Sequence, residues 1–158
     1  MYGINRYYPG AAIAAPIRKE CNMIELINTA VQTVPVGQSV VYNSTPVRGG
    51  CAERHREGSA QITLTKPGRY LVAFSGNIAV PTGETVGEIS LGLTYDGEVL
   101  GGSLMRVTPA AVEEYFNVST QHYVDVPNCC CVTVAVQNTS TIPILVDNPN
   151  ITAVRVCG

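Results

Sequence analysis

Residues 58–80 read GSAQITLTKPGRYLVAFSGNIAV and contain two β-prone runs that are joined by a turn. At the turn, Pro67 fixes φ and Gly68 accepts a positive φ, so the chain reverses direction there. From Arg69 to Val80 the side chains alternate between a large apolar set and a small set, which is the period of a β-strand. The second face is small rather than charged, and such a face suits packing against another sheet or subunit.

Strand signals of the same kind continue along the chain from about residue 23 onward. Asp96-Gly97 separates two β-prone runs, and this pair in such a place is a strong signal for a hairpin. Residues 109–115 are either a helix of at most about two turns or the start of a strand. Roughly eight to ten short strands with almost no helix predict an antiparallel sandwich or barrel.

The composition limits the class of function. With 10 Lys and Arg against 12 Asp and Glu, the net charge is −2, which disfavours a nucleic-acid binder because such a protein needs a basic face. Charged residues make up 14% of the chain, against about 25% in a typical soluble domain. Hydrophobic residues make up 46% of the 158 residues, enough for one domain with a core. This balance indicates that other subunits cover part of the surface.

The first 22 residues differ from the rest, because they follow neither the helix period nor the strand period. We interpret residues 1–22 as an N-terminal arm and residues 23–158 as one domain. Such a tail can simply fray, but tyrosines are common at protein interfaces. We therefore expect the arm to be an anchor to a partner, through Tyr2, Arg6, Tyr7 and Tyr8.

Neither a secretion signal nor a membrane segment is expected. The longest apolar run near the start is Ala11 to Ala15, shorter than the roughly 7–15 apolar residues of a signal peptide. No stretch approaches the roughly 20 apolar residues of a membrane span. We expect assembly in the cytoplasm, where the six cysteines stay reduced and act as small apolar fillers in the core.

The turn and the strand after it resemble a sequence pattern of C1q/TNF-like jelly-roll domains of the compact phage and bacterial type. Gly68, Tyr70, Val72 and Phe74 match the G-x-Y-x-V-x-F pattern of that family position by position. The resemblance spans roughly residues 23–158 and implies an all-β fold, an antiparallel two-sheet jelly-roll sandwich. It also implies a tight homotrimer and a non-enzymatic recognition or surface module. The collagen-like G-X-Y stalk of many members is absent here.

A homotrimer would cover apolar surface without open-ended growth, because closed symmetry ends the assembly. We expect two faces of the domain to contribute to the trimer interface. One is the apolar face of the strand after the turn, with Tyr70, Val72 and Phe74, and the other lies around Tyr115 and Tyr123.

The chain offers little for catalysis. Its two histidines are His55 and His122, and a nucleophilic pair of Cys51 with His55 would lack an orienting third group and an oxyanion turn. No G-x-S-x-G, P-loop or H-E-x-x-H motif occurs. We therefore predict no enzymatic activity, no catalytic residues and no cofactor.

Two sets of residues resemble metal ligands. Cys51, His55 and the run Cys129–Cys131 would have to meet at one zinc ion, but no C-x-x-C spacing supports this. Residues 147–150, Asp-Asn-Pro-Asn, form an oxygen-rich segment that suits calcium, although a plain Asx turn fits the same residues. We expect no metal.

We expect a non-enzymatic structural protein of the virion surface, assembled in the host cytoplasm. It would be a trimeric capsid decoration or head-fibre protein that attaches through its N-terminal arm to a capsid protein or other particle surface protein. The alternative is a receptor- or glycan-binding tip module of a phage tail or spore surface, which binds a host glycan or receptor. In that alternative, Tyr95 near the hairpin tip and the Arg54–Arg56 loop would contact the ligand.

Overall fold

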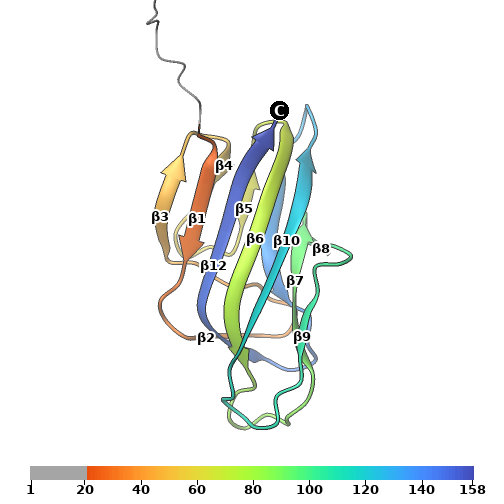
Figure 1. The fold of residues 1–158 in the computed structure, drawn as a ribbon. Coiled ribbons are helices and arrows are strands. Elements are labelled where there is room, and N and C mark those ends of the chain that lie inside the picture. Colours follow the sequence, from red (N-terminus) through yellow and green to blue (C-terminus); the bar gives the residue numbers. More distant parts are fainter. Residues whose placement is uncertain (1–20) are drawn as a thin grey trace, which may run out of the picture.

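Every regular element that the structure describes is a β-strand. The structure is a computed structural model that describes residues 21–158, and twelve strands in this range form two antiparallel sheets (Figure 1). The sheets pack face to face around one apolar core, which confirms the predicted all-β jelly-roll sandwich. Residues 109–115 form turns rather than a helix, and the described range contains no helix that could span a lipid bilayer.

The first sheet brings distant parts of the chain side by side. Its order is β10 (Phe116–Val126), β6 (Gly68–Ala79), β12 (Ile144–Cys157), β1 (Met23–Ile27) and β3 (Ser44–Gly49), and β2 (Gln32–Val34) also pairs with β12. The order of the second sheet is β4 (Glu53–Arg54), β5 (Ile62–Leu64), β11 (Val132–Asn138), β7 (Ile89–Tyr95) and β8 (Glu98–Val99), and β9 (Met105–Val107) also pairs with β7. The last strand, β12, therefore lies between β6 and β1.

Strand β6 shows how alternating side chains build the sandwich. Tyr70, Val72, Phe74 and Ile78 are at most 2% exposed and belong to the core. Leu71, on the opposite face, is only half-buried. Burial of a large apolar side chain stabilises a fold by about 1.5–3 kcal/mol. The face of β6 that carries these four large side chains therefore packs against the second sheet. The alternation predicted from the sequence is confirmed.

The predicted hairpin at Asp96-Gly97 connects β7 with β8. Both turn residues have positive φ, 49° for Asp96 and 88° for Gly97, as a two-residue type I′ turn requires. Thr94 pairs with Val99 across the hairpin. Asp96 Oδ1 also accepts a hydrogen bond from the backbone N–H of Thr133 at 2.8 Å, which ties the turn to β11.

The segment 147–150 differs from the sequence prediction. It does not form a separate loop but lies inside β12, where the pairing with β6 shifts register between Asp147 and Asn150. Asn148 has a φ of 52°, a value that asparagine tolerates better than most residues. The irregularity is a bulge in a continuous strand.

The first and last described residues lie at the same end of the sandwich (Figure 1). Met23 pairs with Val154 near this end, which we call the arm end. The opposite end of the sandwich, which we call the far end, is formed by the loops 80–88 and 108–115. These loops contact each other through a hydrogen bond of 2.7 Å from the backbone N–H of Glu113 to the Val80 carbonyl oxygen. The arm end consists of residues 21–22, 50–52, 65–67, 127–131 and 157–158.

Candidate functional site

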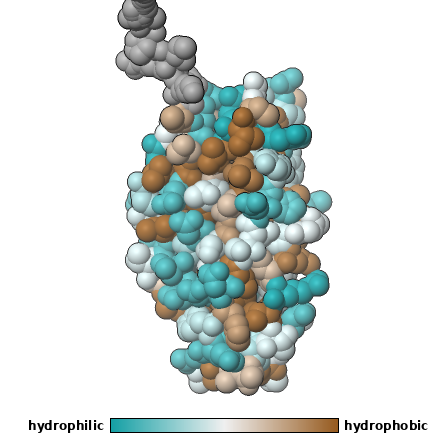
Figure 2. All heavy atoms as spheres, in the orientation of Figure 1, coloured by the Kyte–Doolittle hydropathy of each residue, from teal (hydrophilic) through white to brown (hydrophobic). Residues whose placement is uncertain are grey.

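The outer face of the first sheet carries an apolar strip near the arm end. The register places Leu71 of β6 between Tyr123 of β10 and Val154 of β12. Met23 of β1 follows beside Val154. Tyr123 is 67% exposed, and the other three side chains are half-buried. Figure 2 shows apolar side chains gathered on this part of the face. These four residues, the apolar strip, offer a row that another protein surface can cover.

Polar groups border the apolar strip on both sides. Toward the far end, Asn117 Nδ2 donates to Asn77 Oδ1 at 3.1 Å and to Ser75 Oγ at 3.3 Å, which ties β10 to β6. Toward the arm end, Arg69 binds Asp125 through two bonds, Nε to Oδ1 at 2.7 Å and Nη2 to Oδ2 at 2.8 Å. These bonds hold the pKa of the Asp125 carboxyl below its usual range, so the pair stays charged.

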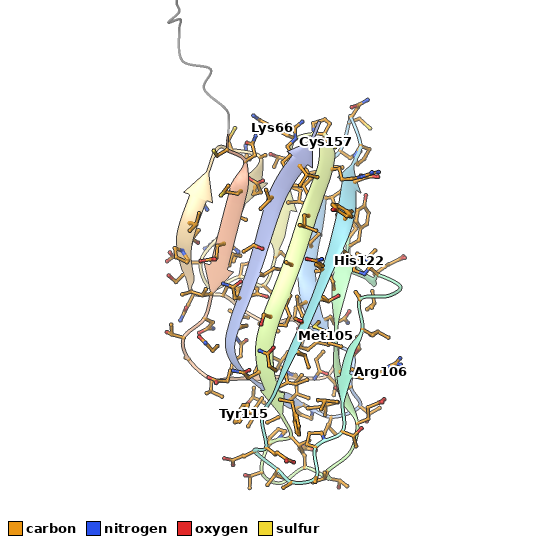
Figure 3. The ribbon with its side chains drawn as sticks, viewed as in Figure 1. Lys66, Met105, Arg106, Tyr115, His122 and Cys157 are labelled. Carbon is orange, nitrogen blue, oxygen red and sulfur yellow. The ribbon has the colours of Figure 1, made fainter. Side chains whose placement is uncertain are left out.

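The structure contradicts part of the predicted trimer interface. Tyr70, Val72 and Phe74 are at most 2% exposed, so they have no surface to offer to another chain. The second sheet of the same chain covers the apolar face of β6. The prediction that this face belongs to the trimer interface is therefore wrong, and only the opposite face of β6 is open to another chain. Tyr115 and Tyr123 are 40% and 67% exposed, and their part in an interface stays a prediction. Tyr115 lies at the far end (Figure 3), away from the apolar strip.

The predicted anchor residues Tyr2, Arg6, Tyr7 and Tyr8 lie outside the described residues. The described part of the chain begins with Cys21 at the arm end. Cys21 lies at the arm end against Gly49, where an added Cβ would come within 2.6 Å of the Cys21 carbonyl oxygen. Any contact that the preceding residues make with a partner therefore starts from the arm end.

The two histidines lie at or next to the edge strands β4 and β10, which stand at opposite edges of the sandwich (Figure 1). His55 follows β4, an edge strand of the second sheet, and His122 lies on β10, an edge strand of the first. His55 Nδ1 is 2.9 Å from the Gln61 carbonyl oxygen, and its ring lies edge-on to Tyr42 at a centroid distance of 6.3 Å. His55 therefore holds its own loop in place, and the two imidazoles do not form a common site.

The thiols occupy unexpected positions. All six cysteines are free and exposed, so the prediction that they fill the core is wrong. Within residues 21–158, no three His, Cys, Asp or Glu side chains come together in a way that could hold a metal ion. This holds for the zinc candidates Cys51, His55 and Cys129–Cys131.

Glu53 is a buried charged residue that the sequence analysis did not single out. Its side chain is 3% exposed, and neither carboxylate oxygen accepts a hydrogen bond from another described residue. Burial raises the pKa of Glu53 to about 7, although a hydrogen bond from its own backbone and the positive charges of Arg155 and Lys66 act in the opposite direction. The phenol of Tyr70 also faces this carboxylate, and burial raises its pKa. Glu53 is thus a carboxyl group whose pKa lies near neutral pH.

We expect the free energy of unfolding to fall as the pH rises from about 4.5 to above 7, because folded Glu53 binds its proton more tightly than unfolded Glu53. Its contribution is complete below the unfolded pKa and is lost as the pH passes the folded pKa. Glu53→Gln should remove this slope and stabilise the protein at about pH 8 by roughly 2–3 kcal/mol. Urea unfolding at about pH 5 and about pH 8 measures both effects. An unchanged slope in Glu53→Gln would contradict the assignment.

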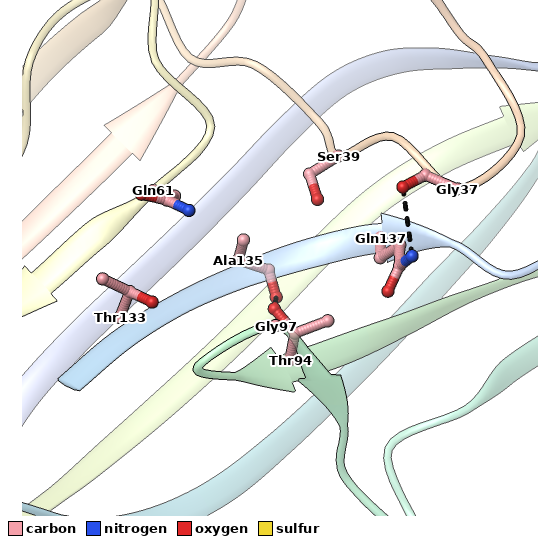
Figure 4. Close-up of a pocket in the computed structure, with 8 residues that line it drawn as sticks. All are labelled: Gly37, Ser39, Gln61, Thr94, Gly97, Thr133, Ala135 and Gln137. Atoms are coloured by element: carbon pink, nitrogen blue, oxygen red, sulfur yellow. Dashed lines mark hydrogen bonds between the residues drawn. The ribbon is translucent and has the colours of Figure 1, made fainter.

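A small hollow lies on the outer face of the second sheet (Figure 4). Its volume is about 150 Å³, and amide and hydroxyl side chains line it. Two of these are already engaged, because Gln137 Nε2 donates to the Gly37 carbonyl oxygen at 3.0 Å and Thr94 Oγ1 donates to the Ala135 carbonyl oxygen at 3.2 Å. The described lining carries neither a charge nor an aromatic ring, so the hollow provides no acid–base group and no platform for stacking a sugar.

Tyr95 does not present a free ring at the hairpin tip. Its hydroxyl donates to the Asp125 backbone oxygen at 3.0 Å, which links β7 to β10 and hence one sheet to the other. Burial raises the pKa of the phenol, so it remains a neutral donor. The geometry therefore gives Tyr95 a structural role instead of the sugar contact expected from the sequence.

The Arg54–Arg56 loop is exposed, as the alternative function requires. Arg54 and Arg56 line a shallow hollow of about 270 Å³ together with Ser59 and Gln61. Two guanidinium groups beside a hydroxyl and an amide match a carboxylate that also carries hydroxyl groups. This hollow is separate from the apolar strip, because it belongs to the second sheet.

Comparison with known proteins identifies the fold. No protein-family model matches the sequence, and no curated protein matches it. The globular domain of zebrafish complement 1qA superposes with a TM-score of 0.66 at 12% identity, over 85% of this chain and 97% of that one. Eiger TNF from S. frugiperda superposes with a TM-score of 0.62 at 11% identity, over 87% of this chain and 94% of that one. The protein has the C1q/TNF-like jelly-roll fold.

The same jelly roll occurs in a protein of a different kind. The PRD1 vertex protein P5 superposes with a TM-score of 0.52 at 14% identity, over 85% of this chain and 96% of that one. At such low sequence identities, the superpositions establish a common fold but not a common function. The function has to be inferred from the surface of each individual protein. For this chain, the surfaces available for function are the apolar strip, the arm end and the hollow beside Arg54 and Arg56.

Proposed function

We propose that this protein is a non-enzymatic structural module that forms a homotrimer through its apolar strip. The strip carries the proposal, because Met23, Leu71, Tyr123 and Val154 form an apolar row between polar groups on one open sheet face. Removal of apolar surface from water favours association by about 25 cal/mol per Å². A ring of three copies covers the strip of every copy and leaves no open contact for further growth.

The proposed place of the trimer is the surface of a virion, where it decorates the capsid after assembly in the host cytoplasm. The described chain begins at the arm end, so an anchor formed by the preceding residues would hold that end against the particle and turn the far end outward. The shared fold of the PRD1 vertex protein P5 supports a position on a particle. The low charged fraction of 14% supports extensive contact with other proteins.

Deletion of residues 1–20 should leave the trimer intact and abolish binding to the particle. The apolar strip lies entirely within the domain that remains, whereas the proposed anchor Tyr2, Arg6, Tyr7 and Tyr8 is removed. Light scattering gives the mass of the shortened protein, and co-sedimentation with capsids from the source phage measures binding. A full-length variant in which the three tyrosines are replaced by Ala shows whether loss of binding is due to these side chains or to the shorter chain. Capsid binding by the shortened protein would refute the arm as anchor.

A second function, recognition of an acidic glycan, is favoured by the hollow beside Arg54 and Arg56. Its two guanidinium groups can bind a carboxylate, while Ser59 and Gln61 can bind sugar hydroxyls. A glycan array that contains matched sialylated and neutral sugars tests this function. Binding limited to the sialylated sugars, and lost in Arg54→Gln/Arg56→Gln, would support it. An array without reproducible binding would refute it.

A further inference from the structure

All six cysteines of the chain lie exposed at the arm end. They come from four separate segments, namely Cys21 before β1, Cys51 after β3, Cys129–Cys131 between β10 and β11, and Cys157 at the end of β12. Figure 3 labels Cys157 at the arm end. Cysteine is among the residue types most often buried, so six exposed thiols at one end are not explained by packing. Their common position indicates a shared chemical role.

Cys157 and Cys21 border the apolar strip. Cys157 pairs with Arg69 on β6, after the pairing of Val154 with Leu71 and a register shift that follows Arg155. Cys21 precedes the strip residue Met23 on β1, which pairs with β12. A second copy that covers the strip therefore also lies next to these thiols.

In the proposed trimer, the run Cys129–Cys131 can reach those thiols from the neighbouring copy. It follows β10, the edge strand that carries the exposed Tyr123. In a ring of three, each contact joins two different surfaces, so a β10 edge from one copy can meet the strip of the next. The thiols of this run are not joined to each other, because Cys129 Sγ and Cys130 Sγ are 3.3 Å apart and a disulfide needs about 2.05 Å.

Building on the proposed homotrimer, we propose that disulfides between Cys157 of one copy and the Cys129–Cys131 run of the next lock the trimer in an oxidising environment. The reducing cytoplasm keeps the thiols free during assembly, and release of the particle exposes them to oxidants. Each link converts two thiols into one S–S bond. The two protons and two electrons released convert one glutathione disulfide into two glutathione thiols.

The test uses the reduced full-length protein. It is incubated with glutathione disulfide, blocked with N-ethylmaleimide and separated on a denaturing gel without reductant. We expect bands of two and three subunits that dithiothreitol removes, with a yield that is unchanged by about tenfold dilution because the thiols meet within one trimer. Asn128, the residue before Cys129, lines one hollow together with Cys157 of the same chain. A disulfide between Cys157 and the Cys129–Cys131 run within one chain is therefore the competing product. Oxidised protein that migrates as one subunit would overturn the proposal.

Variants assign the link to particular thiols. Cys157→Ser should abolish the covalent trimer, as should the joint replacement of Cys129, Cys130 and Cys131 by Ser, whereas Cys51→Ser should retain it. A protein without native cysteines that carries Thr85→Cys at the exposed far end controls for random collision and should give no ladder. Light scattering before oxidation separates the two proposals. Monomers at that stage would refute the homotrimer, whereas trimers that never cross-link would refute only the disulfide lock.

Discussion

Leu71→Glu is expected to convert the proposed trimer into monomers. Leu71 occupies the middle of the apolar strip between Tyr123 and Val154, so the new carboxylate would be buried in each contact without a partner. We take the cost as about 3 kcal/mol per contact, which weakens each contact roughly a hundredfold. The side chain faces away from the core, so the subunit keeps its fold. Light scattering should show the mass falling from three subunits to one subunit of 16.8 kDa.

Gln61→Glu is the matched control for this experiment. It adds the same charge at an exposed position just before β5 of the second sheet, remote from the apolar strip, and should leave the proposed trimer intact. The far-ultraviolet circular dichroism of both variants should equal that of the unmodified protein. A Leu71→Glu protein that folds and still measures as a trimer would show that the strip is not the interface.

Phe74→Ala is expected to destabilise the subunit itself. Phe74 is 2% exposed and packs between the sheets, so truncation leaves a cavity and costs about 3–5 kcal/mol of unfolding free energy. That is a large part of the roughly 5–15 kcal/mol available to a domain. Urea unfolding followed at two protein concentrations should give the same difference from the unmodified protein at both, because the loss lies within each subunit.

Leu71→Ala provides the comparison on the opposite face of the same strand. It removes a similar amount of side chain from the outward surface, so its effect on the unfolding free energy should act through association and disappear once dilution has separated the subunits of both proteins. If Leu71→Ala behaved as a concentration-independent core variant and Phe74→Ala altered only association, the assignment of the two faces of β6 would be reversed.

Local features of the fold could be predicted from the sequence because their causes are local. The alternation along β6 follows from the two-residue period of a strand. The turn at Asp96-Gly97 follows from the positive φ that both residues adopt. The same pattern could not say what covers each face. It identified Tyr70, Val72 and Phe74 as an apolar face but not that a second sheet of the same chain buries them.

Features that depend on pairing between distant strands could not be predicted in this way. Cys21 and Cys157 lie far apart in the sequence and come to one end only because β1 pairs with β12. Glu53 lies in a polar stretch, yet the pairing of β4 with β5 places it opposite Leu64 and buries it. Both cases require knowledge of which strands are neighbours, and neither residue type signals its position by itself.

The common location of the first and last described residues makes the protein suited to use as a display scaffold. The loop that follows β6 is exposed at Thr85 and Val86, at the opposite pole from the proposed attachment. An epitope inserted between these two residues would project into solvent and, in the proposed trimer, recur three times. A tag fused after Gly158 would instead lie at the arm end, close to the particle to which the arm is proposed to bind.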